Sequence, residues 1–133
     1  MTPTQCPPDL KQAALNARDL SYSPYSKFRV GAAVLGEDGR IAVGANVENA
    51  SYPAGICAER VAYPRALMEG LKPVAIAVTS DNHDPISPCG VCRQFLSEFG
   101  SDLVVHMVGK ERVVTATIGE LLPMGFGSKE LTG

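Results

Sequence analysis

The chain has 133 residues, of which 45% are hydrophobic and 20% charged, and this is typical of one globular domain spanning residues 1–133. Its formal net charge of −2 disfavours a nucleic-acid partner, because affinity for a phosphate polymer depends on clustered Lys and Arg. No apolar run approaches the roughly 18 residues that span a bilayer, and residues 1–10 lack the apolar stretch of a signal peptide. We therefore expect a cytoplasmic protein with no membrane partner.

The first predicted element is a helix over residues 9–20, after a segment, residues 1–8, that we expect to be flexible. Asp9 is suited to cap the N-terminus of this helix. Apolar residues recur with helical spacing along one face of it, namely Leu10, Ala13, Ala14, Ala17 and Leu20.

Strands and helices then alternate. In chain order we expect strands over 29–36 and 40–47, a helix from 57 toward 70, a strand over 73–80, a helix over 90–99, strands over 103–108 and 112–117, and a short helix over 117–122. Gly39 belongs to a tight hairpin signal between the first two strands. Helices that alternate with apolar strands predict an α/β fold with three layers, α/β/α, around a five-stranded mixed sheet.

Pro64 lies inside the helix predicted from residue 57. A proline has no N–H to donate to the carbonyl of Arg60, and its ring crowds that carbonyl, which costs about 3 kcal/mol in a helix interior. We therefore expect a kink or a local rearrangement one turn past Glu59.

Three cysteines lie at predicted helix starts. Cys89 and Cys92, with two residues between them, can both reach one ion, and Cys57 begins the preceding helix. Catalytic zinc sites keep three protein ligands and leave the fourth position for water. The positive end of a helix dipole also favours the thiolate that a metal requires. We expect Cys57, Cys89 and Cys92 to bind one Zn²⁺ per chain.

Glu59 follows the first of these cysteines by two residues, so its carboxylate can face the open position without binding the metal. A carboxylate there can accept and return a proton as a general acid and base. Three thiolates leave a net negative charge on the zinc site, and Arg60 could reduce it by donating hydrogen bonds to them. Without these neighbours, Glu59 would be explained as a favourable charge at a helix N-terminus.

Two other interpretations of the cysteines stay open at this point. Cys89 and Cys92 could form a thioredoxin-like redox pair. Alternatively, the zinc could be structural and closed by a fourth ligand, for which the candidates are Cys6, His83 and His106. We expect Cys6 to be a bystander and His106 to be structural or exposed.

Five segments distributed in order between residues 22 and 127 resemble the cytidine deaminase family, specifically its small homotetrameric type with a cysteine as the first zinc ligand. They are residues 22–33, 46–52, 56–60, 87–94 and 120–127. Zinc deaminases share a His- or Cys-headed motif with Glu two residues on, followed by Pro-Cys-x-x-Cys. The resemblance implies hydrolysis of free cytidine or deoxycytidine to uridine or deoxyuridine and ammonia, in pyrimidine salvage.

The resemblance also implies substrate-binding roles. Phe28 would lie against the pyrimidine face, and Asn46 and Glu48 would hydrogen-bond the ribose 3′-hydroxyl. The backbone around Ala58 would hold the base, and the carbonyl of Ser87 would face the leaving amine. A neighbouring subunit of a homotetramer would supply Ala50, Tyr52 and Phe126, so that active sites are shared between subunits.

Other functions compete with this one. A related enzyme could deaminate another aminopyrimidine nucleoside, or a base inside nucleic acid, although the acidic charge disfavours the latter. A thiol–disulfide oxidoreductase, or a zinc-stabilised binding module without catalysis, would belong to a different class.

Overall fold

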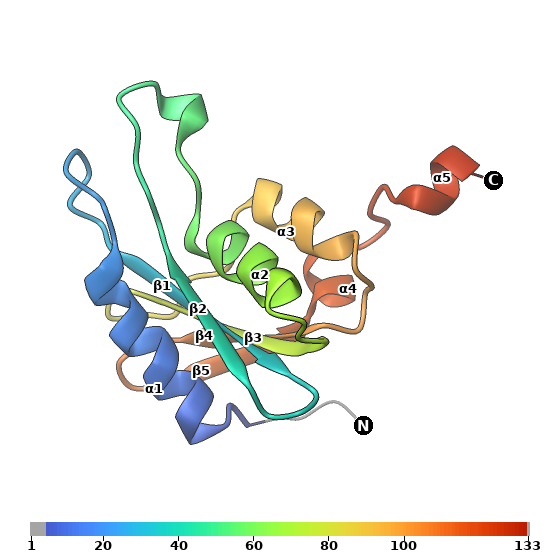
Figure 1. Ribbon diagram of the computed structural model, residues 1–133, viewed down its shortest axis with the longest axis horizontal. Helices are drawn as coiled ribbons and strands as arrows, with labels where there is room; N and C mark the ends of the chain where they lie inside the picture. Colours follow the sequence, from blue (N-terminus) through green and yellow to red (C-terminus); the bar gives the residue numbers. More distant parts are fainter. Residues whose placement is uncertain (1–4, 133) are drawn as a thin grey trace.

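The computed structural model describes residues 5–132, in which a five-stranded sheet lies between α1 on one face and α2, α3 and α4 on the other (Figure 1). This confirms the predicted three-layer α/β/α architecture. The elements in chain order are α1 (Pro8–Ala17), η1 (Arg18–Leu20), β1 (Val30–Gly36), β2 (Ile41–Ala45), η2 (Tyr52–Ala54), α2 (Ala58–Met68), β3 (Pro73–Ser80), α3 (Gly90–Ser97), β4 (Val104–Val108), β5 (Val113–Thr117), α4 (Ile118–Leu121) and α5 (Ser128–Thr132).

The sheet is mixed, with strand order β2-β1-β3-β4-β5. Strand β1 is antiparallel to both β2 and β3, β3 is parallel to β4, and β4 is antiparallel to β5. The parallel pair requires a crossover connection, which contains α3. Residues 75–80 of β3 are all buried, as expected for a central strand with helices on both faces.

Alternate residues of the strands point to opposite faces of the sheet and belong to two separate hydrophobic cores. Ala32 and Val34 of β1 join the core beneath α2, α3 and α4, whereas Ala33 joins the core beneath α1. Small residues bring the helices close to the sheet: a Cβ on Gly31 would lie 2.3 Å from the carbonyl oxygen of Ala14 in α1, and one on Gly44 would lie 2.5 Å from the backbone nitrogen of Ala62 in α2.

The first helix differs from its prediction at both ends. It begins at Pro8, with Pro7 at the cap position and no side-chain cap, so Asp9 lies in the first turn and is not the cap. A proline suits that first position because its fixed φ is already helical. Leu20 is 66% exposed, because residues 18–20 tighten into a 3₁₀ turn and rotate it away from the predicted face. Residues 1–4, half of the segment predicted to be flexible, lie outside the described residues.

Helix α2 runs through Pro64 without ending there. Tyr63, the residue before it, is only 3% exposed and packs against Phe99, with 4.8 Å between ring centroids, and edge-on against Phe95 of α3. This aromatic packing offsets part of the lost hydrogen bond to the Arg60 carbonyl, and α2 continues past Pro64 to Met68. A kink at Pro64 stays a prediction.

Among residues 5–132, no helix is long and apolar enough to cross a bilayer.

The contact between Gly44 and α2 generates a stability prediction. Gly44→Ala should lower the free energy of unfolding by roughly 1–3 kcal/mol, because the new methyl group would press on the backbone of the helix rather than on a movable side chain. Urea unfolding would measure the change. Gly127→Ala is the matched control, because a Cβ at Gly127 would meet no atom within 4 Å; equal midpoints for the two variants would contradict the prediction.

Candidate active site

The three predicted cysteines converge at the N-termini of two helices. Cys57 caps α2, Cys89 caps α3, and Cys92 lies in the first turn of α3. Their three Sγ atoms all lie within 4.8 Å of one another, and the Sγ atoms of Cys57 and Cys89 are 3.8 Å apart. Three thiols in this arrangement fit Zn²⁺, which prefers thiolate ligands and bonds them at about 2.3 Å.

None of the candidates for a fourth ligand joins the three cysteines. Among residues 5–132, no further His, Cys, Asp or Glu belongs to the group of ligand atoms that lie within 4.8 Å of one another. Cys6 packs on the α1 side of the sheet, while His106 is fully buried in β4 beside Thr115. His83 is exposed and contacts Asp84 and Glu111. The geometry therefore matches a catalytic zinc site with an open position better than a closed structural site.

The protonation of the cluster also suits a metal. The neighbouring thiol of Cys92, followed by the Arg60 guanidinium and the Cys89 thiol, lowers the pKa of Cys57 to about 5 despite partial burial. Proximity to Cys57, together with burial, raises the pKa of the Cys92 thiol. A divalent cation would displace the proton of Cys92, as metal binding to thiols generally does.

Arg60 lies against the cluster, one turn into α2. Its Nη2 donates to the Sγ of Cys57 at 3.6 Å, and its Nε is buried without a hydrogen-bond partner among the described residues. The guanidinium thus contacts a thiol, as the sequence led us to expect, and it withdraws negative charge from the sulfurs.

Glu59 is buried beside the thiols at the start of α2. Its side chain is only 3% exposed, and burial raises the pKa of its carboxyl to about 7, with the Cys57 thiolate adding to the rise. A carboxyl group with a pKa near the working pH can both accept and donate a proton.

A pocket of about 710 Å³ opens above these groups and is mostly apolar in its walls. The five residues predicted to bind substrate within their own chain line it, namely Phe28, Asn46, Glu48, Ala58 and Ser87, together with Cys57, Cys89, Glu59 and Arg60. Tyr52, predicted to enter the site of a neighbour, lines the pocket of its own chain as well. Cys92 lies beneath the floor, fully buried. Ala50 and Phe126 do not line it; Phe126 is 57% exposed, and its carbonyl accepts from Gln94 of α3.

Asn46 and Glu48 are hydrogen-bonded within the pocket walls, and each keeps one polar group without a partner among residues 5–132. The Oδ1 of Asn46 accepts from the backbone N–H of Val30 at 2.9 Å and from the Ser21 hydroxyl, and its Nδ2 donates to the Phe28 carbonyl at 2.9 Å. One Nδ2 hydrogen is left over. The Oε1 of Glu48 accepts two backbone N–H groups, and its Oε2 accepts one hydroxyl. One lone pair of Oε2 is left over.

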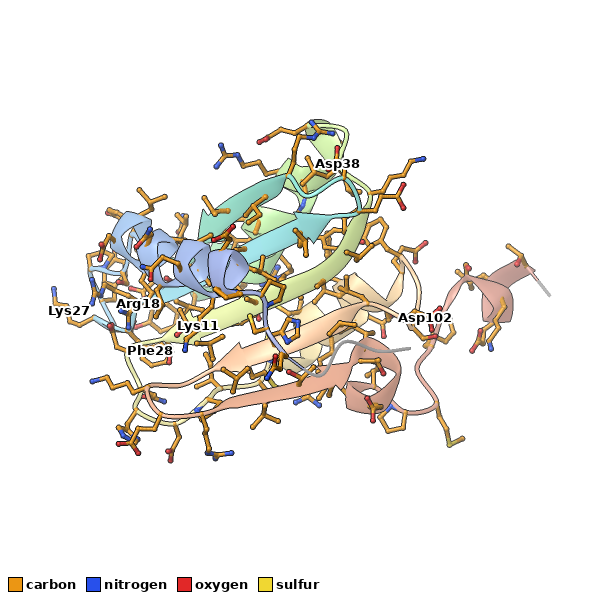
Figure 2. The ribbon with its side chains drawn as sticks, turned by 90° about the horizontal axis from the view of Figure 1, so that it is seen from below. Lys11, Arg18, Lys27, Phe28, Asp38 and Asp102 are labelled. Atoms are coloured by element: carbon orange, nitrogen blue, oxygen red, sulfur yellow. The ribbon has the colours of Figure 1, made fainter. Side chains whose placement is uncertain are left out.

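The loop before β1 presents Phe28 to the pocket. Lys27 has a φ of 60°, a left-handed conformation that is uncommon outside glycine. After it, Arg29 donates to Asp81 from its backbone and from its guanidinium, at 3.0 and 2.8 Å. Figure 2 shows Lys27 and Phe28 at the end of the molecule where α1 finishes near Arg18, remote from the β1–β2 turn marked by Asp38.

Arg93, to which the sequence analysis gave no role, anchors the loop that leads into Cys89. Its guanidinium donates to the carbonyl of Pro88 at 2.8 Å, to the Ser87 hydroxyl at 2.8 Å, and to the carbonyl of Leu121 in α4 at 2.7 Å. The only sequence signal for it is its position beside Cys92, because its partners are mostly backbone atoms. Tyr25 and Ser26, which also line the pocket, were likewise missed.

Comparisons with known proteins agree with this site. Residues 5–108 match the family described as "Cytidine and deoxycytidylate deaminase zinc-binding region". The chain is 43% identical to a cytidine deaminase of Sporosarcina psychrophila over 119 residues, covering 87% of this chain and 88% of the relative. It is 46% identical to a probable cytidine deaminase of Dictyostelium discoideum, covering 90% and 82%.

A solved structure is similar as well. The crystal structure of cytidine deaminase from Burkholderia pseudomallei is 45% identical to this chain and superposes with a TM-score of 0.85, covering 89% of this chain and 97% of that one.

The Arg93 contacts generate a prediction about metal retention. Arg93→Gln should release bound zinc to a chelator about 10- to 100-fold faster, as removing a group that orients a metal-binding loop typically does. Circular dichroism would check that the variant is folded. Arg65→Gln is the matched control, because Arg65 contacts Glu69 and the Val43 carbonyl instead. Equal rates of zinc release from both variants would count against an anchoring role.

Proposed function

The chain belongs to the family of zinc-binding cytidine and deoxycytidylate deaminases, and from this membership we propose that it hydrolyses free cytidine and deoxycytidine to uridine and deoxyuridine, releasing ammonia. The observation that carries the proposal is the convergence of Cys57, Cys89 and Cys92 beneath a pocket that the buried carboxyl of Glu59 also lines. These cysteines would hold one zinc per chain, which supplies a Lewis acid that lowers the pKa of a bound water to about 7.

Glu59 carries the protons of the reaction. As the carboxylate it takes a proton from the attacking water, whose oxygen adds to C4 of the pyrimidine, and it delivers that proton to N3. It then transfers a second proton from the new C4 hydroxyl to the 4-amino group, the C4–N bond breaks, and ammonia leaves. Its raised pKa suits both transfers. Arg60 would withdraw charge from the thiolates, which keeps the metal electrophilic.

The free groups of Asn46 and Glu48 match a ribose hydroxyl. A 3′-hydroxyl can accept the unused Nδ2 hydrogen of Asn46 and donate to the unused lone pair on Oε2 of Glu48. Burying a substrate that lacked the hydroxyl would leave both groups unpaired.

The base would be held by three other parts of the pocket. Phe28 would stack on the pyrimidine face, the backbone at Ala58 would bind its edge, and the carbonyl of Ser87 would face the leaving amine. All three residues line the pocket.

We also propose that the enzyme is a homotetramer with shared active sites, acting in the cytoplasm in pyrimidine salvage. Tyr52, Met68 and Phe126 are 80%, 83% and 57% exposed, and a neighbouring subunit would bury such large apolar side chains. Ala50 and Phe126, which do not line the pocket of their own chain, would reach the pocket of a neighbour. Tyr52 lines the pocket of its own chain, and its 80% exposed side chain would also contact the site of a neighbour.

The role of Glu59 can be tested by removing its ionisable proton. Glu59→Gln should keep one zinc per chain and the wild-type fold, while uridine formation from cytidine falls by about 10²- to 10⁴-fold, the usual contribution of general acid–base catalysis. Glu69→Gln, on the exposed end of the same helix, should retain wild-type turnover. Normal deamination by the Glu59 variant would refute the mechanism.

Shared active sites can be tested by mixing two inactive variants. Glu59→Gln lacks the proton carrier, and Phe126→Ala lacks the aromatic ring proposed to enter a neighbour's site. Subunit exchange between them should restore activity toward about one quarter of the wild-type value, because some mixed sites then combine an intact Glu59 with an intact Phe126. Absence of any recovery, with mixed oligomers verified by mass spectrometry, would mean that sites are not shared in this way.

A further inference from the structure

We propose that Ser26 is a positioning residue that links the ribose-binding carboxylate of Glu48 to the base-facing ring of Phe28, and that this link sets the preference for nucleosides with a free 3′-hydroxyl. The inference rests on the proposed function, since it concerns how that substrate is recognised. Ser26 touches neither the cysteines nor Glu59 in the described contacts, and its effect on the reaction would pass through its two neighbours.

Ser26 bonds to both subsites with one hydroxyl group. Its Oγ donates to Oε2 of Glu48 and accepts the backbone N–H of Phe28 at 3.0 Å. Its own backbone N–H donates to the other carboxylate oxygen, Oε1, at 3.1 Å, beside the N–H of Tyr25 at 2.9 Å. A continuous hydrogen-bonded chain therefore runs from the sugar subsite to the base subsite through a single residue.

The Ser26 hydroxyl determines how the carboxylate is held. With it, Glu48 is bonded at both oxygens, and Oε2 keeps one lone pair in a defined direction. Without it, both remaining bonds are on Oε1, and the carboxylate can pivot about that oxygen. Binding of a substrate hydroxyl would then also fix a mobile carboxylate, and the conformational entropy lost in doing so weakens binding.

The same hydroxyl supports the backbone that carries Phe28. The chain turns sharply at Lys27, where φ is 60°, and the N–H of Lys27 donates to the Ser23 carbonyl at 3.1 Å. The Ser26 hydroxyl accepts the N–H of Phe28, and the Asp81 carboxylate accepts the N–H of the next residue, Arg29, at 3.0 Å. Displacing either bond would shift the ring relative to the sugar subsite.

The charge of Glu48 gives the link its selectivity. The Ser26 hydroxyl, followed by the two backbone N–H groups, holds the pKa of Glu48 below its usual value, so the group is an anion at neutral pH. An anion next to the 3′ position forms a charge-assisted hydrogen bond with a hydroxyl group there, and it repels a phosphate. A 3′-deoxy substrate would offer it no donor.

The test compares cytidine with 3′-deoxycytidine in the wild type and in Ser26→Ala. We expect the wild type to prefer cytidine, and the ratio of the two kcat/KM values to fall by about tenfold in the variant, as expected for weakening a charge-assisted hydrogen bond. The change should lie mainly in KM for cytidine. Ser26→Thr, which keeps the hydroxyl, should retain most of the ratio, and Ser101→Ala, at an exposed serine that does not line this pocket, is the control.

The outcomes separate this inference from the proposed function. If the wild type produces no uridine from cytidine, the proposed function fails. If it produces uridine but Ser26→Ala keeps the wild-type ratio within about twofold, or if the wild type itself does not prefer cytidine over 3′-deoxycytidine, the link through Ser26 is refuted. An equal loss of the ratio in Ser26→Ala and Ser26→Thr would also refute it, because the hydroxyl would then not be the cause.

Discussion

The site depends on one constraint, that two helix N-termini meet so that three thiols reach a single point. Cys57 caps the helix that follows β2, and Cys89 caps the helix that follows β3. The positive ends of both helix dipoles then point toward the same sulfurs, where they would stabilise the thiolates that a divalent cation requires. Arg60, which donates to the Sγ of Cys57, would add to this stabilisation.

The close packing of α2 on the sheet explains why Glu59 can work beside that cluster. Ala58, Ala62 and Ala66 are fully buried on the inner face of α2, and Gly44 of β2 admits the helix backbone. This contact buries the first turn of the helix, including Glu59, which raises its pKa into the range of a proton carrier. The packing of small residues thus raises the pKa of the Glu59 carboxyl, which would have its usual value on an exposed helix.

The walls of the pocket depend on polar bonds rather than on packing. Asn46 holds the Phe28 carbonyl and the Val30 N–H, and Glu48 holds the loop at Tyr25 and Ser26. Residues proposed to contact the sugar are therefore also the residues that fix the loop carrying the aromatic ring. Such a network leaves few unused hydrogen-bonding groups, and those few are the ones proposed to select the substrate hydroxyl.

The sequence by itself determined the alternation of elements, the three metal-binding cysteines and the candidate proton carrier, because these depend on local periodicity, helix starts and the chemistry of individual side chains. β3 was predicted residue for residue, since an apolar run bounded by turn signals is a local feature. Only the tertiary structure decided that Leu20 turns outward, that Tyr63 packs against Phe95 and Phe99, and that Arg93 and Ser26 anchor the pocket. Their partners lie in other segments or on the backbone, and a contact of that kind leaves no periodic trace in the chain.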